Sequence, residues 1–170
     1  MIEHTGLNQN LYEVDSQVYD RLSLSITNVV NEREGVEYDA CRFQLNGMNI
    51  ISRSSKTTPK KSGQFVTFWK RDQLGETAPH SENDPFDFYI VQSRSRDQLG
   101  QFVFPKSVLI KKGYIRTALK DGKRGFRVYP IWDQTSNKQA EKTQDWQLKY
   151  FYKIDELTNL NKVRELYGIQ

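Results

Sequence analysis

The amino-acid sequence predicts a single α/β domain in which a mixed β-sheet packs against helices. Apolar residues recur at helical spacing near both ends of the chain, whereas the middle shows the two-residue alternation of strands. A chain of 170 residues has the length of one domain and can bury a sizeable core. An order of helix, strands and helices is typical of a sheet covered by helices and argues against an all-β barrel.

The N-terminal part of the chain is expected to form one long helix. Asn10 and Glu13 have the spacing of a capping box, which satisfies the first free N–H groups of a helix. Apolar residues then recur at three- and four-residue intervals, and this pattern predicts an amphipathic helix that continues to about Asn31. We therefore expect residues 10–170 to form the domain and residues 1–9 to be a flexible N-terminus.

A β-hairpin is expected next. Residues 41–45 and 48–54 read as two strands, the first with apolar and polar residues in alternation. Asn46-Gly47 between them is the pair that two-residue hairpin turns favour, because both positions tolerate a positive φ. Pro, Gly and charged residues indicate a loop over residues 56–63, and residues 64–70 alternate again as a third strand.

Turn residues and periodicity predict the remaining elements. They are a loop over 75–85, strands over 86–91 and 101–104, a short helix from Pro105 that ends at Gly113, an Asp121-Gly122 turn, a strand over 126–131, a helix over 136–154 and a terminal helix over 157–167. Strands that alternate with helices in this way predict the mixed sheet stated above.

The composition excludes several classes of protein. With 27% charged residues and no long apolar run, the sequence predicts no membrane span, and its first residues do not resemble a signal peptide. Cys41 is the single cysteine, so it cannot form an internal disulfide or a zinc site alone, and we expect it in the core. We expect a cytoplasmic protein without a cofactor, while its oligomeric state stays open.

The net charge of +4 is modest, but the basic residues are concentrated in two windows, residues 40–71 and 106–127. These windows contain 15 of the 25 basic residues and only one of the 21 acidic residues, Asp121. Such segregation produces a local positive field whatever the net charge. The acidic residues lie mainly in the N-terminal segment, the 76–87 loop and the C-terminal third.

The two windows supply the candidate binding residues, on the expectation that they become neighbours. Lysine and arginine neutralise the phosphates of DNA or RNA, and aromatic side chains beside them stack on unpaired bases. The candidates are Arg53, Lys56, Lys60, Lys61, Trp69, Lys70, Arg71, Lys106, Lys123, Arg124, Arg127 and Tyr129. Two other interpretations stay open for the same surface, a small anionic ligand or an acidic protein partner.

Four segments together resemble the MepB-like protein family over roughly residues 10–152. They are YDACRFQLNG at 38–47, KTTPKKSGQFVTFWKR at 56–71, GQFVFPK at 100–106 and GKRGFRVYP at 122–130, supported by Trp146-Gln147. The resemblance implies a fold similar to the restriction-endonuclease-like α/β domains that handle nucleic acids. It also implies a bacterial origin, since the family is named after a gene beside a multidrug efflux pump, but it implies no established activity.

The metal-dependent nuclease chemistry of such folds requires carboxylates on two core strands. The expected second strand contains no acidic residue, and Phe68 stands where an acid-x-Lys pair would need its carboxylate. A rival metal site would combine Asp84 or Asp87 with Asp121-Gly122-Lys123. We favour nucleic-acid binding without catalysis and without a metal, and a metal-dependent nuclease is the alternative.

The two histidines and one serine offer no better catalytic site. His4 falls in the expected flexible terminus and His80 in an acidic loop, so both are interpreted as surface residues. Ser81 directly follows His80, and neighbours in a loop do not form a catalytic triad. The sequence therefore predicts no catalytic residue.

Overall fold

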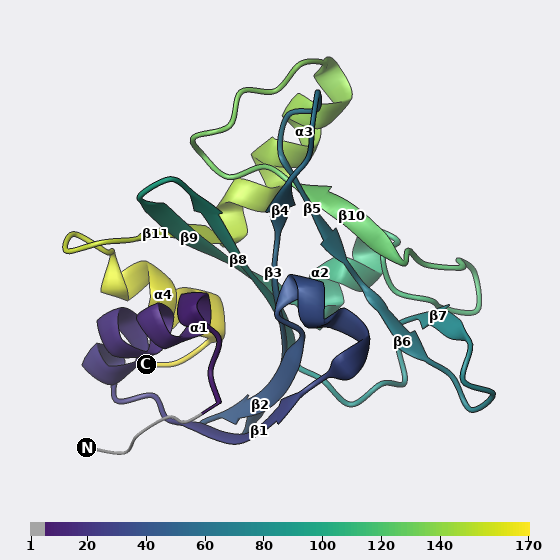
Figure 1. Cartoon of the computed structure of the whole chain (residues 1–170), viewed down its shortest axis with the longest axis horizontal. Helices are drawn as coiled ribbons and strands as arrows, with labels where there is room; N and C mark the ends of the chain where they lie inside the picture. The colour runs from purple at the N-terminus through teal and green to yellow at the C-terminus, as the bar shows by residue number, and fades with distance from the viewer. Residues whose placement is uncertain (1–5) are drawn as a thin grey trace.

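The computed structural model describes residues 6–170 and shows a mixed α/β arrangement around one large sheet (Figure 1). Within the described residues this sheet has six strands in the order β1-β2-β3-β8-β9-β11. β3 and β8 pair in parallel, and the other neighbours are antiparallel. The strands are β1 (Ile26–Asn31), β2 (Cys41–Leu45), β3 (Met48–Ser54), β8 (Phe88–Ser95), β9 (Gln98–Pro105) and β11 (Phe151–Ile154).

One face of the large sheet is covered by the two ends of the chain. Helix α1 (Gln9–Val14) continues through a π-helical turn, η1 (Asp15–Tyr19), and a 3₁₀ turn, η2 (Asp20–Leu22), while α4 (Leu160–Tyr167) packs beside it. Their buried side chains form one hydrophobic cluster with inward residues of β1, β2, β3, β8, β9 and β11. Removing these apolar side chains from water stabilises this layer.

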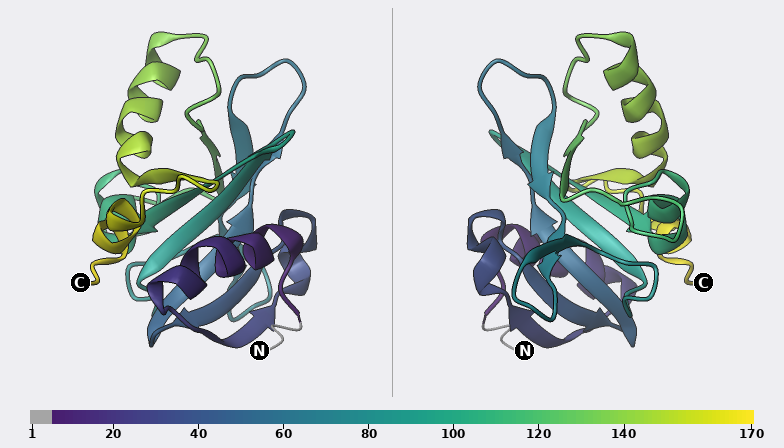
Figure 2. Two further views of the ribbon diagram at one scale, coloured as in Figure 1. Left: turned by 90° about the vertical axis from the view of Figure 1, so that its left-hand side faces the viewer. Right: turned by 90° about the vertical axis from the view of Figure 1, so that its right-hand side faces the viewer.

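The opposite face carries a second, aromatic cluster beneath several smaller elements (Figures 1 and 2). A small sheet has the order β10-β5-β4 and consists of β4 (Lys56–Thr57), β5 (Gln64–Thr67) and β10 (Gly125–Val128). A hairpin is formed by β6 (Trp69–Arg71) and β7 (Thr77–Pro79). The helices are α2 (Lys106–Lys111) and α3 (Lys138–Gln147), and the 3₁₀ turn η4 (Leu148–Tyr150) follows α3. Phe68, Phe104 and Phe126 pack at the centre of this cluster.

The structure confirms the central hairpin and the short helix. Asn46 and Gly47 have φ values of 48° and 82°, so both positions of the turn are left-handed, as the sequence predicts. Cys41 is buried in the first cluster, and α2 follows Pro105 directly. Within the described residues, no helix is long and apolar enough to cross a membrane.

The long N-terminal helix predicted to continue to Asn31 is wrong. The helical segment ends at Leu22, because Ser23 takes a left-handed conformation, and residues 26–31 form β1. β-branched residues are frequent in β1 and favour a strand, and pairing with β2 supplies its hydrogen bonds. The cap is also earlier than expected, since Asn8 accepts the N–H of Leu11.

The flexible terminus predicted for residues 1–9 falls partly outside the described residues, which begin at residue 6. Within the described part, Leu7 packs against the first cluster and Gln9 already belongs to α1.

Two later predictions are also corrected. The helix predicted over 136–154 ends at Gln147, and residues 151–154 instead form the edge strand β11 against β9. The loop predicted over 75–85 contains β7, which pairs with β6. For β11 the partner strand lies about 50 residues away, so local periodicity does not reveal its hydrogen bonds. β6 and β7 instead form a local hairpin.

The contact between β9 and β11 leads to a stability prediction. A Cβ atom at Gly100 would lie 2.3 Å from Cζ of Phe151, so Gly100→Ala must displace that ring. We expect this overpacking to lower the free energy of unfolding by about 1–3 kcal/mol. Urea unfolding measures the change, with the exposed β1 substitution Thr27→Ala as a control that stays within about 0.5 kcal/mol. An unaltered midpoint for Gly100→Ala would contradict this packing.

Candidate functional site

A cavity of about 670 Å³, lined by both charged and apolar side chains, lies on the second face of the large sheet, over the strands β1–β3. Its floor consists of side chains that alternate outward from these strands, including Arg42, Ile51 and Arg53. Its walls come from the end of β5, from the β6–β7 hairpin and from residues 80–86. The smaller elements cover the aromatic cluster but leave this end of the sheet open.

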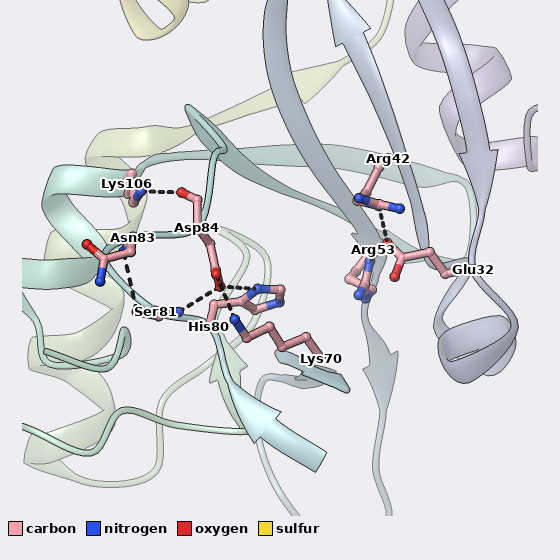
Figure 3. A network of polar contacts seen from close by, with 9 residues as sticks. All are labelled: Glu32, Arg42, Arg53, Lys70, His80, Ser81, Asn83, Asp84 and Lys106. Atoms are coloured by element: carbon pink, nitrogen blue, oxygen red, sulfur yellow. Dashed lines mark hydrogen bonds and ion pairs between the residues drawn. The ribbon is translucent and has the colours of Figure 1, made fainter. Parts of the chain in front are cut away.

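Arg53 is the buried charge of the cavity floor. It is 3% exposed, and its Nη1 donates a hydrogen bond of 2.9 Å to the Ser52 carbonyl oxygen. Glu32 Oε1 lies 3.7 Å from Nη1 of Arg53 and 3.5 Å from Nε of Arg42, so one carboxylate faces two guanidinium groups (Figure 3). The buried Nε of Arg53 has no hydrogen-bond partner within residues 6–170. Buried polar atoms on both sides of this contact, Arg53 Nε and Glu32 Oε1, are therefore without a hydrogen bond within the described residues.

Asp84 organises the opposite wall (Figure 3). Its Oδ1 accepts a 2.6 Å hydrogen bond from Lys70 Nζ, and its Oδ2 accepts a 2.8 Å bond from the Ser81 N–H. Lys106 Nζ donates a hydrogen bond to the backbone carbonyl oxygen of Asp84. Burial alone raises the pKa of Asp84, but the hydrogen bonds from Lys70 and Ser81 and the charge of Lys70 outweigh burial and lower this pKa. Asp84 is therefore a carboxylate that holds Lys70 at the cavity wall.

His80 corrects the expectation of a surface histidine. It is 6% exposed, and its ring packs against Phe68 with centroids 4.6 Å apart. Burial, together with the nearby charge of Arg53, lowers the pKa of His80 from 6.5 to about 4, although Asp84 opposes the shift. Its Nδ1 lies 3.6 Å from Asp84 Oδ2, while its buried Nε2 has no hydrogen-bond partner in the described chain. His80 is thus a neutral imidazole with one unused nitrogen.

The mouth of the cavity is framed by Trp69 and Arg71 on β6 and by η3 (Arg33–Tyr38). Arg71 lies over the indole ring, with its guanidinium carbon 5.4 Å from the ring centroid, and its Nε is 3.8 Å from Glu34 Oε1. Both side chains of this ion pair are about half exposed, so solvent screens the pair. Trp69 is partly buried and keeps one side toward the cavity.

The two basic windows meet along β5. Because β5 pairs with β4 on one edge and with β10 on the other, Lys56 and Arg127 flank Phe65 in register. Farther along, the Phe68 N–H donates to the Arg124 carbonyl oxygen at 2.8 Å. We define the basic strip as the exposed cations beside β5, which are Lys56, Lys60, Lys61, Lys123 and Arg124. Within the described residues, none of these five side chains forms an ion pair.

Two candidates prove to be structural. Arg127 donates hydrogen bonds to Thr58 and to the carbonyl oxygens of Ser62 and Gly63, so it braces the β4–β5 loop. Tyr129 was expected to stack on bases, but it is 9% exposed and its ring packs against Gly63. The chain itself therefore covers most of this ring.

Sequence reasoning did not select Glu32, Arg42 or His80 as site residues and considered Asp84 only as a metal ligand. One signal in the sequence pointed to Arg42. The Asn46-Gly47 turn fixes the hairpin register and places Arg42 opposite Ile51. Ile51 precedes Arg53 by two residues, so Arg42 and Arg53 share one face of the hairpin. Nothing local marks His80 as buried, because its partners come from other segments.

The rival metal site is not assembled. Asp87 accepts the Asn49 N–H at 2.7 Å, whereas Asp121 pairs with Arg116 at 2.8 Å. Among residues 6–170 there is no group of three or more His, Cys, Asp or Glu side chains placed to hold a metal ion. The three aspartates proposed for the metal site therefore have separate local roles.

A mixed six-stranded sheet with a cavity lined by charged side chains above β1–β3 defines a mixed α/β domain. The chain belongs to the MepB-like family, whose model matches residues 32–153. This confirms the resemblance found in the sequence. A structure described as the crystal structure of MepB is 31% identical, covers 89% of this chain and 97% of its own, and superposes with a TM-score of 0.74.

A bacterial homing endonuclease, I-Ssp6803I, is more distantly similar. It is 14% identical, covers 83% of this chain and 93% of its own, and has a TM-score of 0.41. No curated protein sequence matches the chain.

The depressed pKa of His80 predicts an acid-sensitive stability. The unfolded chain takes up the proton of this histidine near pH 6.5, whereas the folded chain does so only near pH 4. The free energy of unfolding should therefore fall by up to about 3 kcal/mol as the pH drops through this window. Urea unfolding across the window measures the effect, and His80→Gln should lose this part of the decrease. An NMR titration in which His80 protonates near pH 6.5 would refute it.

Proposed function

We propose that this MepB-like domain binds DNA or RNA through the basic strip and without cleaving it. The observation that carries the proposal is the meeting of two distant basic windows along β5. Lys56 and Lys123 lie over the rings of Tyr38 and Tyr114, and the strip's other cations have no such partner among the described residues. Exposed cations of this kind neutralise phosphates, which releases counterions and supplies sequence-independent affinity. The four residues of β5 span roughly 13 Å at about 3.3 Å per residue, enough for a few phosphates of a strand.

The contrast with the cavity supports this assignment. There the cations are already paired, Arg42 and Arg53 with Glu32, Lys70 with Asp84, and Arg71 with Glu34. A cation that is already paired with a carboxylate gains less binding free energy from a phosphate than an unpaired cation does, because the carboxylate must be displaced. The strip is therefore the surface that attracts an extended polyanion.

The restriction-endonuclease-like topology and the cytoplasmic location expected from the sequence are part of this proposal. The parallel β3–β8 pair inside an otherwise antiparallel sheet, covered by helices, is compatible with that topology. Fold analogy does not itself establish binding or catalysis.

Charge reversal at the tip of the β4–β5 loop tests the strip. We expect Lys60→Glu combined with Lys61→Glu to weaken binding to an oligonucleotide of about 20 nucleotides at least tenfold and to reduce the salt slope by about 1.5. Fluorescence anisotropy over a range of salt concentrations, with DNA and RNA in single- and double-stranded form, provides the measurement.

The matched control is Lys149→Glu combined with Lys153→Glu, which makes the same change of net charge at exposed positions outside the strip. This control should retain most of the affinity. Equal losses in both double variants would show a net-charge effect and reject the assigned surface.

We also predict that the protein does not cleave nucleic acid with Mg²⁺ or Mn²⁺, because the acidic side chains proposed for metal binding are engaged elsewhere. Supercoiled DNA and end-labelled RNA, incubated with either metal and analysed on gels, test this. Metal-dependent nicking that is abolished by Asp84→Ala or Asp87→Ala, but retained by the exposed substitution Asp97→Ala, would overturn the non-catalytic assignment.

A further inference from the structure

We infer that the floor of the cavity over β1–β3 binds an uncharged nucleobase through a row of three side-chain amides. The inference deepens the proposed function and rests on it for a base that belongs to a strand on the basic strip. Three observations carry it: the amide row itself, the β-bulge that completes the row, and the pairing of the charged side chains around it.

The amide row crosses the neighbouring strands β1, β2 and β3 (Figure 1). Asn49 on β3 lies directly opposite Gln44 on β2, and its Oδ1 accepts a 3.2 Å hydrogen bond from Gln44 Nε2. Gln44 Oε1 in turn accepts a 2.6 Å bond from Nδ2 of Asn28 on β1. All three side chains line the cavity. The floor therefore presents a continuous row of amide groups.

Both ends of the row are accessible to a ligand. Asn28 is exposed, and Gln44 and Asn49 are partly buried. Within the described residues, neither Asn28 Oδ1 nor Asn49 Nδ2 has a hydrogen-bond partner, and Asn49 Nδ2 is not among the atoms shut off from solvent. Exchanging oxygen and nitrogen in all three amides reverses the direction of donation and leaves the two ends equally free. A ligand on the floor therefore meets a free donor and a free acceptor.

A β-bulge in β1 brings Asn28 into the row. The pairing of β1 with β2 shifts between Thr27 and Val30, which is the mark of an extra residue in β1. Asn28 lies in this interval and has a φ of 55°, in the left-handed region. Asparagine tolerates this conformation better than most residues, and bulges beside functional sites redirect side chains. The bulge thus adds a third amide to the pair that the hairpin register sets.

The charged side chains of the cavity favour an uncharged ligand. Each cation that lines the cavity faces a carboxylate. The pairs are Arg42 and Arg53 with Glu32, Lys70 with Asp84, and Arg71 with Glu34. An anionic ligand must displace a carboxylate from its partner, and a cationic ligand must displace a basic group. A neutral ligand leaves these pairs in place and needs only hydrogen bonds from the amide row.

Size and apolar surface agree with a base. A volume of about 670 Å³ falls within the range of small-molecule sites, which is about 300–1,000 Å³. The partly exposed ring of Trp69 and the exposed side chains of Val30 and Pro85 add apolar surface to the polar floor. A nucleobase has apolar faces and an edge with adjacent donors and acceptors, and side-chain amides match that edge. This combination of surfaces favours a base as the ligand.

The cavity is reached from the basic strip. Thr67 is the last residue of β5 and lines the cavity, and Trp69 on its wall begins β6. A strand that lies along β5 therefore brings its bases to the edge of the cavity. Phosphate contacts on the strip carry no sequence information, whereas hydrogen bonds from the amide row distinguish one base from another. The arrangement predicts a preference among bases.

A titration of the full chain with the four nucleosides, their 5′-monophosphates and ribose tests the inference, followed by NMR signals of backbone and side-chain amides. We expect at least one nucleoside to shift the side-chain signals of Asn28, Gln44 and Asn49 and to bind about tenfold more tightly than ribose. Its monophosphate should bind within about threefold of the nucleoside, because the phosphate finds no unpaired cation in the cavity. Equal binding of ribose, or a monophosphate that binds about tenfold more tightly than its nucleoside, would overturn the assignment.

Two substitutions remove amides from the row. Asn28→Gly keeps the left-handed backbone of the bulge, and Gln44→Ala removes the centre of the row at a partly exposed position. Each should weaken nucleoside binding about fivefold or more. The control Gln134→Ala removes an exposed amide outside the cavity and should bind like the wild type. Circular dichroism and thermal unfolding establish that each variant is folded, and unchanged binding by both folded row variants would reject the row.

The Lys60→Glu, Lys61→Glu variant separates the inference from the proposed function. It should bind the nucleoside like the wild type while losing affinity for strands. Gln44→Ala should instead reduce the difference in affinity among homopolymeric strands and leave the salt slope unchanged, because the amide contacts no phosphate. Nucleoside binding without any strand binding supports the amide row and rejects the strip. Strand binding that ignores base identity, together with no nucleoside binding, overturns the amide row and leaves the strip intact.

Discussion

The pairing of β5 on both of its edges is the constraint on which the surface of this protein depends. Hydrogen bonds to β4 and to β10 join segments about 60 residues apart into one small sheet. Phe68, Phe126 and Val128 then anchor this sheet in the aromatic cluster of the large sheet. Within the basic strip, Lys56 lies on β4, whereas Lys60, Lys61, Lys123 and Arg124 lie in the loops that flank the small sheet.

The open end of the large sheet follows from the same arrangement. The small sheet and α2 cover the second face over the aromatic cluster, while the cavity lies over β1–β3. On that face Arg42 is exposed, whereas Ile51 and Arg53 are buried. A cationic side chain on such a floor needs compensation, and Glu32 supplies it for both Arg42 and Arg53. The compensation is incomplete, since the buried atoms Arg53 Nε, His80 Nε2 and Glu32 Oε1 have no hydrogen-bond partner within the described residues.

Local sequence patterns identified the elements whose stability is local. The Asn46-Gly47 hairpin and the helix after Pro105 depend on turn and cap residues a few positions apart, and both were predicted. The predicted helices wrongly included residues 26–31 and 151–154. There the aromatic and β-branched residues fit both the helical and the strand period, and pairing with another strand determines that these segments are strands. His80 was expected at the surface for a similar reason, because the side chains that bury it, such as Phe68, come from other segments of the chain.

By itself, the sequence determined the mixed α/β class, the central hairpin, the segregation of basic residues and membership of the MepB-like family. Only the tertiary structure decided which of those basic residues are available. Lys70 is bound by Asp84, Arg53 faces Glu32, and Arg127 braces a loop, whereas Lys60 and Lys61 stay exposed. The physical reason is that ion pairs and hydrogen bonds act within a few ångströms, and the partners at that distance lie 14 to 69 positions away in the chain.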